Sequence, residues 1–199
     1  MNETLLALLK AKAIPAEIIE AFAKIKRELF VPEHLVPYAY EDTALPIQHG
    51  TTLAQPSTIA TMLKLLEANN AQKILEIGTG SGYVLALLHQ LNSQATLYGL
   101  EINQKLAVEA KNRLSDKENV HVLATSGTHG LLTQAPFDRI LVSAAAPDKS
   151  ILLNLLSQLT DQGILVGPVN DTLLQIKKAG IEHTVIAFPG FTFVPLLTE

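Results

Sequence analysis

Apolar residues recur at helical spacing over the first 30 positions of the chain. Leu5, Leu8 and Leu9 follow this spacing, and residues 18–25 resume it after a break that ends at Pro15. These positions predict two N-terminal helices.

Residues 30–50 contain three prolines and few periodic apolar positions, so they predict an irregular segment. Helical spacing returns over residues 56–67, where Ile59, Met62 and Leu66 share one face. A third helix is therefore expected directly after the irregular segment.

From residue 73 onward, short apolar runs alternate with longer amphipathic ones. This alternation is typical of a parallel sheet with helices on both of its faces. In chain order, the expected elements are strand 73–77, helix 81–91, strand 95–100, helix 103–114, strands 119–124 and 137–144, helix 149–159 and strand 163–169.

Three further runs, at residues 172–178, 182–188 and 191–197, predict strands that end the chain. The turns between them are too short for a crossover connection, so these strands should pair antiparallel. The fold class is therefore α/β: a Rossmann-like, doubly wound, mostly parallel sheet with an antiparallel C-terminal edge and an N-terminal helical extension.

Composition excludes several classes of function. The chain has 199 residues, a net charge of −4 and no run of basic residues, which disfavours nucleic acid or a membrane surface as a partner. It contains no cysteine, so a thiol nucleophile and a Cys-ligated metal are excluded, and no metal site is expected. No apolar run approaches the roughly 18 residues of a membrane span, and a cytoplasmic protein is expected.

The segment ILEIGTGSGY carries the strongest motif of the chain. Gly78, Gly80 and Gly82 lie between a predicted strand and a predicted helix. Small residues let a ligand approach the backbone there, and the amides of the helix N-terminus favour an anionic group. A tight strand-to-helix turn with no ligand is the alternative interpretation.

Two carboxylates accompany the glycines. Glu101 follows the second predicted strand, where a carboxylate can accept hydrogen bonds from ribose hydroxyls; a capping or surface role is the alternative. Glu76 lies inside an apolar strand, where an unpaired carboxylate would be costly. We therefore expect Glu76 to accept hydrogen bonds from the glycine segment or from a ligand amine.

The spacing of the glycines distinguishes between cofactors. A dinucleotide site requires Gly-x-Gly-x-x-Gly, and here the third glycine comes one residue early. This spacing, with an acid inside the first strand, resembles the glycine loop of S-adenosylmethionine-dependent methyltransferases. The resemblance, rather than the spacing alone, implies S-adenosyl-L-methionine as the cofactor.

With its flanking segments included, the chain resembles the protein-L-isoaspartate O-methyltransferase family over nearly its whole length. The matching segments occur in the family's order. They are FVP at 30–32, AYEDTALPI at 39–47, GTTLAQP at 50–56, LEIGTGSGY at 75–83, APFDRILVSAAAP at 135–147, GILVGPV at 163–169 and FVPLL at 193–197.

The resemblance implies a carboxyl O-methyltransferase that repairs damaged proteins by methylating the carboxylate of L-isoaspartyl residues. It implies a monomer, in which residues 1–70 hold the N-terminal helices and the substrate loop and residues 71–199 form the cofactor-binding core. The implied cofactor-binding residues are Glu76, Gly78, Thr79, Gly80, Ser81, Gly82, Glu101, Ser126, Gly127 and Gln55.

The substrate loop departs from the family pattern. Thr52 keeps the pattern, Thr51 stands where the family has glutamine, and Ala54 stands where the family has its active-site serine. These three positions are the expected catalytic positions. Ser126 replaces an aspartate that helps to hold the adenine in the family. The alternative function is a family member with lost or altered catalysis, which methylates another substrate or acts as a binding protein.

Overall fold

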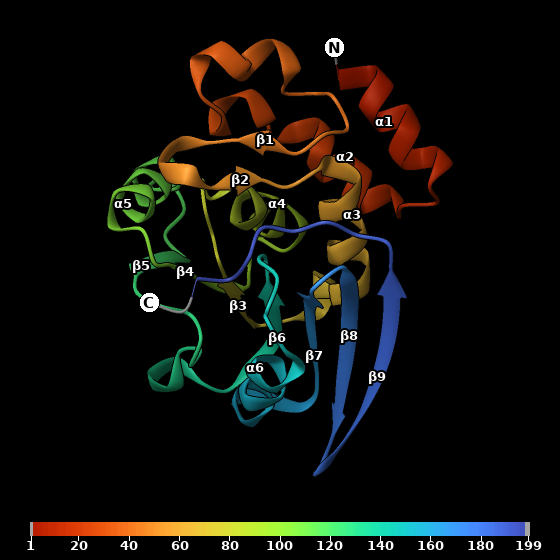
Figure 1. Ribbon diagram of the computed structural model, residues 1–199, viewed down its shortest axis with the longest axis vertical. Coiled ribbons are helices and arrows are strands. Elements are labelled where there is room, and N and C mark those ends of the chain that lie inside the picture. Colours follow the sequence, from red (N-terminus) through yellow and green to blue (C-terminus); the bar gives the residue numbers. More distant parts are fainter. Residues whose placement is uncertain (1, 198–199) are drawn as a thin grey trace.

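A seven-stranded sheet runs through the molecule in the computed structural model, which describes residues 2–197 (Figure 1). In spatial order its strands are β5 (Val120–Ala124), β4 (Thr96–Glu101), β3 (Lys73–Ile77), β6 (Phe137–Val142), β7 (Leu159–Val169), β8 (Thr172–Ala179) and β9 (Glu182–Pro189).

The five strands from β5 to β7 are parallel, and β8 and β9 are antiparallel. The predicted fold class is therefore confirmed, including the antiparallel C-terminal edge. The carboxyl ends of the parallel strands meet at one edge of the sheet, and the glycine segment leaves the sheet there, at the end of β3.

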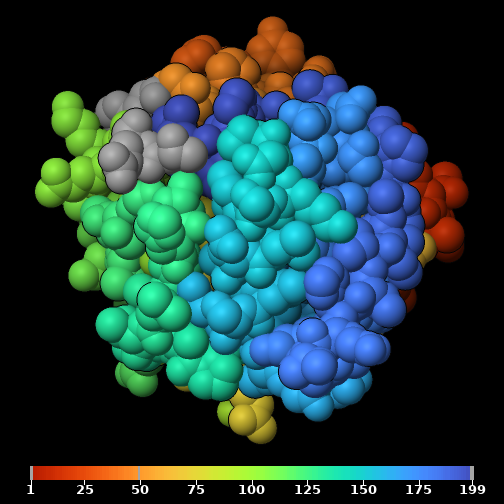
Figure 2. Space-filling view, turned by 60° about the horizontal axis from the view of Figure 1, so that its bottom comes forward, coloured from red at the N-terminus to blue at the C-terminus, as the bar shows by residue number. Residues whose placement is uncertain are grey.

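Helices cover both faces of the sheet, and alternate residues of each strand pack against them. On β3, Ile74 belongs to a cluster built with the N-terminal helices and α4 (Tyr83–Leu91), whereas Leu75 and Ile77 belong to a second cluster. The second cluster contains α6 (Lys149–Asn154) and its 3-10 extension η6 (Leu155–Gln158). In Figure 2 the cyan residues that include α6 cover the centre of one face, beside β8 and β9 in blue. The remaining helix of the core, α5 (Gln104–Arg113), connects β4 to β5.

The N-terminal layer consists of α1 (Asn2–Ala11), α2 (Ala16–Lys24) and α3 (Pro56–Leu66), as the apolar spacing predicted. Leu5 and Leu9 of α1 share one apolar cluster with α3 and with Leu173 of β8. The layer is therefore packed onto the core of the sheet. Short 3-10 turns complete the chain: η1 (Arg27–Phe30), η2 (Glu33–Tyr38), η3 (Gln48–Gly50), η4 (Ala68–Asn70) and η5 (Leu132–Gln134). Within residues 2–197 no helix has the length and apolarity needed to cross a membrane.

A small hairpin, which the sequence pattern did not reveal, begins inside the segment predicted to be irregular and ends just after it. Its strands are β1 (Leu45–Pro46) and β2 (Thr52–Leu53), which pair antiparallel with Leu45 opposite Leu53. Strands of two residues are too short to show an alternating pattern. The hairpin lies across the top of α4 in Figure 1.

The strand predicted over residues 191–197 is wrong. This segment is extended and makes only an isolated bridge, between Pro195 and Ala145. Ala145 N donates to Val194 O at 2.8 Å, and Leu196 N donates to Ala145 O at 2.8 Å. Its backbone pairs with the loop after β6 instead of with a strand. The apolar run correctly indicated an extended segment, but it could not show that this segment has no neighbouring strand to pair with.

Gly99 of β4 allows the glycine segment to pack closely on the sheet. A Cβ at this position would lie 2.4 Å from Thr79 Oγ1 and 2.5 Å from Leu85 Cδ1. We expect Gly99→Ala to lower the free energy of unfolding by about 3 kcal/mol, because both side chains would have to move in a packed core. Urea denaturation checks this value.

Gly180→Ala is the matched control, because Gly180 lies in the exposed turn between β8 and β9. A Cβ added there would have no atom within 4 Å, and the φ of Gly180 is +62°. Only the cost of the left-handed conformation, about 1 kcal/mol, should appear in this variant. Equal losses in the two variants would contradict the close packing at Gly99.

Candidate active site

The glycine loop, residues 78–82, connects β3 to α4. Gly78, Gly80 and Gly82 have φ values of +81°, +57° and +87°. L-residues, which carry a Cβ, rarely adopt this left-handed region of φ. The path of the loop therefore requires glycine at all three positions. The motif lies between a strand and a helix, as the sequence predicted.

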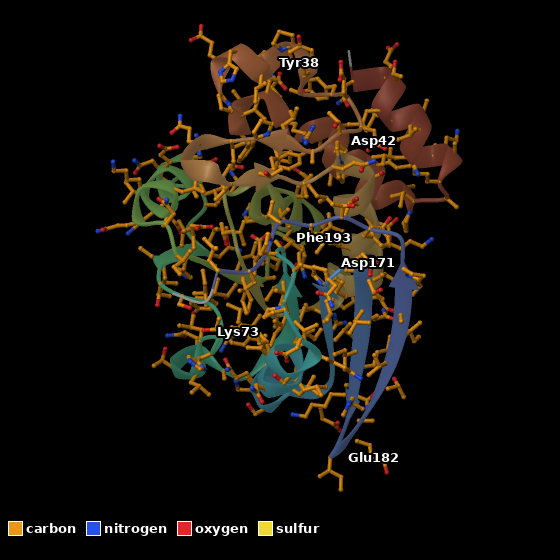
Figure 3. The ribbon with its side chains drawn as sticks, in the orientation of Figure 1. Tyr38, Asp42, Lys73, Asp171, Glu182 and Phe193 are labelled. Carbon is orange, nitrogen blue, oxygen red and sulfur yellow. The ribbon has the colours of Figure 1, made fainter. Side chains whose placement is uncertain are left out.

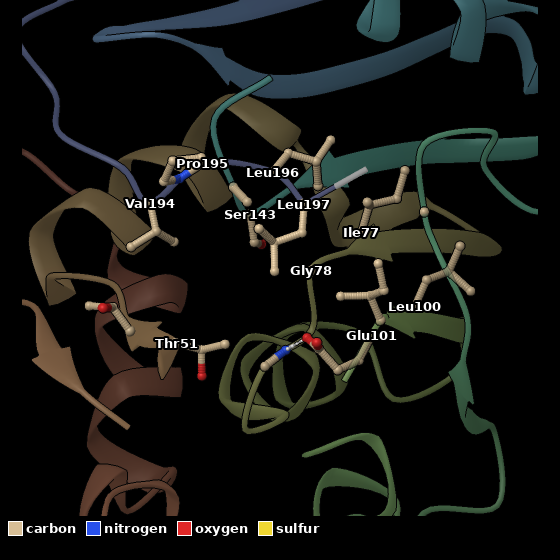
Figure 4. Close-up of a pocket in the computed structure, with 15 residues that line it drawn as sticks. Thr51, Ile77, Gly78, Leu100, Glu101, Ser143, Val194, Pro195, Leu196 and Leu197 are labelled. Atoms are coloured by element: carbon tan, nitrogen blue, oxygen red, sulfur yellow. Dashed lines mark hydrogen bonds between the residues drawn. The ribbon is translucent and has the colours of Figure 1, made fainter. Parts of the chain in front are cut away.

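The main-chain amides of this loop donate hydrogen bonds to the end of β4, and these bonds hold the loop. Gly78 N and Thr79 N both donate to Leu100 O, at 2.9 and 3.1 Å. Gly80 N donates to Glu101 Oε2 at 2.8 Å, drawn as a dashed line in Figure 4. Glu101 Oε1 accepts from Asn103 N at 2.9 Å. Each oxygen of the Glu101 carboxylate is therefore fixed by one backbone amide, and each keeps capacity to accept another hydrogen bond.

A pocket opens beside Glu101 at the carboxyl edge of the sheet (Figure 4). The parts of the chain that form it are the hairpin, the ends of β3, β4 and β6, the glycine loop, the loop after β5 and the C-terminal segment. The lining residues of this Glu101 pocket are Thr51, Thr52, Ile77, Gly78, Gly80, Leu100, Glu101, Ile102, Gly127, Ser143, Ala144 and residues 194–197.

A second pocket surrounds Glu76 and shares Thr52, Gly78, Gly80 and Ser143 with the first. The two pockets are therefore parts of one site that meet at the glycine loop. The other lining residues of this Glu76 pocket are Ile47, Leu53, Ala54, Ile59, Met62, Glu76, Thr79, Ser81, Tyr83, Val84 and Leu141.

Glu76 is completely buried, and burial raises its pKa to about 8. Ser143 Oγ donates to Glu76 Oε1 at 2.8 Å. Among the described residues, neither Glu76 Oε2 nor the buried hydroxyl of Ser81 has a hydrogen-bond partner. A buried carboxylate oxygen that lacks a donor lines a pocket here, and a cationic donor such as an ammonium group would satisfy it.

The hairpin brings the three expected catalytic positions to this site. Thr51 lines the Glu101 pocket, Ala54 lines the Glu76 pocket, and Thr52 lines both. The hydroxyl of Thr51 donates to Gln48 O at 2.9 Å, within the hairpin tip. Thr52 is therefore the loop residue that lies where the two pockets meet.

Among the expected cofactor-binding residues, Glu76, Gly78, Thr79, Gly80, Ser81, Glu101 and Gly127 line one or both pockets. Gly127 also needs to be glycine, because a Cβ there would lie 2.2 Å from Ile77 Cγ2. Gly82, the last residue of the loop, lines neither pocket, and a Cβ added there would lie 3.0 Å from Leu114 Cδ1.

Besides Gly82, two further expected residues lie outside the lining of both pockets. Gln55 Nε2 donates to Asp42 Oδ2 at 2.9 Å and to Ser57 Oγ at 3.2 Å. The hydroxyl of Ser126 lies 3.1 Å from that of Thr128. A binding role for Gln55 or Ser126 stays a prediction from the sequence.

Sequence reasoning missed Ser143 and gave no role in the site to the C-terminal segment. Ser143 directly follows β6, the neighbour of β3, so its place at the carboxyl edge is the signal that could have revealed it. The C-terminal residues 194–197 have no such signal, because their position depends on bonds to Ala145.

Comparison with known proteins identifies relatives over the full chain. The family model described as Protein-L-isoaspartate(D-aspartate) O-methyltransferase matches residues 1–199. A protein-L-isoaspartate O-methyltransferase of Ignicoccus hospitalis is 40% identical over 191 residues, which cover 92% of this chain and 90% of the relative. One of Cronobacter sakazakii is 39% identical over 201 residues, which cover 98% and 95% of the two chains.

Solved structures share the fold. A protein-L-isoaspartate O-methyltransferase superposes with a TM-score of 0.89 and 24% identity over 98% of this chain and 65% of that longer chain. A putative one from Plasmodium falciparum, in complex with S-adenosyl-L-homocysteine, has a TM-score of 0.84 and 22% identity, covering 100% and 99%. At these identities the likeness supports the architecture.

The raised pKa of Glu76 makes the stability of the ligand-free protein depend on pH. The folded protein keeps a proton on Glu76 up to about pH 8, whereas the unfolded chain releases it above about pH 4.5. The free energy of unfolding should therefore fall as the pH rises through this window. In Glu76→Gln, which does not titrate, this contribution should be absent.

Urea denaturation of both proteins at pH 5, 6, 7 and 8 tests the effect. The wild type should lose stability relative to Glu76→Gln at each step. Two stability curves that run parallel across the whole range would contradict the proposed protonation of Glu76.

Proposed function

The chain belongs to the protein-L-isoaspartate(D-aspartate) O-methyltransferase family, and from this membership we propose that it methylates the carboxylate of L-isoaspartyl residues with S-adenosyl-L-methionine. One observation carries the proposal: the β1–β2 hairpin holds Thr52 where the Glu101 and Glu76 pockets meet. A methyl acceptor held by the hairpin would lie directly beside the cofactor site.

The residues of the site fit the cofactor. S-adenosyl-L-methionine, when bound, supplies a methyl group on a positively charged sulfur. The glycine loop leaves room for close approach to the backbone, and Glu101 keeps free acceptor capacity for ribose hydroxyls. Glu76 Oε2 and the Ser81 hydroxyl provide buried polar groups for the amino-acid portion.

The acceptor needs positioning more than activation. A carboxyl group is already ionised at neutral pH, so the site requires no strong base to deprotonate it. The protein must hold the carboxylate in line with the methyl group. Such positioning can lower the activation free energy by several kcal/mol. The hydroxyl of Thr52 is the donor best placed to orient the carboxylate, and residues 194–197 form an apolar wall of the Glu101 pocket.

The proposed substrates are damaged proteins or peptides that carry isoaspartate. The net charge of −4 and the absence of a basic run support the proposal that the protein binds neither nucleic acid nor membranes. A cytoplasmic location stays a prediction from the sequence. A monomeric state and a division of the chain near residue 70 stay predictions from the sequence.

Ala54 limits the expected rate. It lines the Glu76 pocket at the position where the family has its serine, and it brings no hydroxyl to the site. One hydrogen bond to a charged group contributes about 1.5–3 kcal/mol, which corresponds to about ten- to a hundredfold in rate. The same observation favours, as a second candidate, a relative that methylates a different acceptor.

The first test compares two peptides that differ only in the linkage of one aspartate. With cofactor labelled in its methyl group, the isoaspartyl peptide should release labelled methanol after base hydrolysis, and the aspartyl peptide should release none. Calorimetry with S-adenosylhomocysteine serves as the control for an intact site. Cofactor binding without turnover of the isoaspartyl peptide would refute the proposed reaction.

The second test restores the missing hydroxyl. We expect Ala54→Ser to raise kcat/KM for the isoaspartyl peptide by about tenfold, because it adds one donor beside the acceptor. Ala54→Cys is the control of nearly equal size with a weak donor, and it should not raise kcat/KM. If neither variant gains activity, the substrate loop serves another acceptor.

A further inference from the structure

A buried arginine holds the base of the substrate hairpin. Arg27, in η1, is completely buried, and the hydrogen bonds that its guanidinium makes within the described residues all end on main-chain carbonyls. Nη1 donates to Ala39 O at 2.8 Å and, over a longer distance, to Glu41 O at 3.4 Å. Nη2 donates to Thr43 O at 3.2 Å and to Ala54 O at 3.0 Å.

These four carbonyls lie in the two chain segments that lead into and out of the hairpin, here called its legs. Ala39, Glu41 and Thr43 precede β1, whereas Ala54 directly follows β2. Nη2 alone therefore connects the two legs. Since the guanidinium is planar and its donors point in fixed directions, the group sets the separation and the relative position of the legs.

The hairpin backbone accepts hydrogen bonds from both terminal nitrogens of Arg27, whereas the buried Nε has no hydrogen-bond partner among the described residues. Among the ion pairs of the described residues, none includes Arg27. Burial lowers its pKa to about 10, against the favourable effect of neighbours that include Asp42, so the guanidinium stays protonated at neutral pH. A buried cation without hydrogen bonds would be costly, so this charge stabilises the arrangement in which the carbonyls converge on it.

Other contacts fix the same base. The Asp42 carboxylate accepts from Ser57 N at 2.8 Å and from Gln55 Nε2 at 2.9 Å, which attaches the first leg to the start of α3. The hydroxyl of Tyr40 donates to the carboxylate of Glu28, next to Arg27 in sequence. Figure 3 shows Asp42 in the layer above the sheet. The legs are thereby held, and the residues between them extend to the pockets.

We propose that Arg27 is a positioning residue for methyl transfer, which sets where the hairpin holds Thr52 and Ala54 relative to the glycine loop. The inference about turnover depends on the proposed function, whereas the inference about hairpin position does not. The bond from Nη2 ends on the carbonyl of Ala54, whose side chain lines the Glu76 pocket. A shift of this carbonyl therefore moves the residues at the junction of the pockets.

The test uses Arg27→Lys, which keeps the charge but replaces the fork by a single ammonium group. Hydrogen exchange measured by mass spectrometry should become at least about fivefold faster over residues 44–55, because the legs lose a shared donor. Exchange in β3, β4 and α4 should stay unchanged. Calorimetry should show S-adenosylhomocysteine binding within about threefold of wild type, because the glycine loop is held separately by β4.

Turnover should respond more strongly than binding. The kcat for the isoaspartyl peptide, corrected for the folded fraction, should fall by about tenfold or more, because misplacement of the acceptor acts on the transition state. Arg27→Gln, with two neutral donors, should give a larger fall in the same direction. Because Arg27→Lys keeps the positive charge, its hydrogen exchange and its kcat should lie between those of the wild type and those of Arg27→Gln.

Arg139→Lys is the matched control. Arg139 also donates to main-chain carbonyls, at Glu67 and Asp138, but it lies near the amino end of β6, away from both pockets. This variant should change neither exchange over residues 44–55 nor corrected kcat.

Three results would overturn the proposal: unchanged exchange over residues 44–55 in Arg27→Lys, a loss of kcat that only follows the unfolded fraction, or failure of both Arg27 variants to fold while Arg139→Lys folds. If the wild type itself does not methylate the isoaspartyl peptide, the proposed function fails. Hydrogen exchange then decides the role of Arg27 in hairpin position alone.

Discussion

The attachment of the glycine loop to the end of β4 is the contact on which the rest of the site depends. A loop with three positive-φ glycines has little intrinsic preference for one path, so its path must be imposed from outside. The Leu100 carbonyl and the Glu101 carboxylate impose it by accepting from three consecutive amides. The same bonds orient Glu101 itself, so the loop and the carboxylate that faces the pocket are fixed together.

The N-terminal layer supplies the second half of the site. Its apolar helices share a core with the sheet, and this packing provides the free energy that keeps a cation buried beneath the hairpin. The hairpin strands have two residues each, too few to stabilise themselves in water. Contacts outside the strands therefore help to fix their position: Arg27 of η1 donates to the carbonyl of Ala54, and Asp42 of the first leg accepts from Ser57 N of α3.

The sequence was most informative where local patterns decide structure. The strand–glycine–helix order and the antiparallel edge follow from periodicity and turn length, and Glu76 and Glu101 could be placed from their strands. Ser143 could have been found from its position after β6, but its bond to Glu76 depends on the pairing of β6 with β3. The position of residues 194–197 could not be predicted, because it depends on pairing with a distant loop. Arg27 was invisible for a related reason: an arginine followed by a polar residue looks exposed, and only the fold shows that four carbonyls surround it.

The wall formed by residues 194–197 has a consequence for how the site is assembled in time. This segment follows every strand of the sheet along the chain, and it joins the pocket through bonds to Ala145, about 50 residues earlier. These bonds close a loop of about 50 residues that contains β7, β8 and β9, and the entropy cost of closing it falls when those strands are already in place. The wall of the pocket is therefore expected to be among the last contacts to form during folding, after the strands of the sheet have paired.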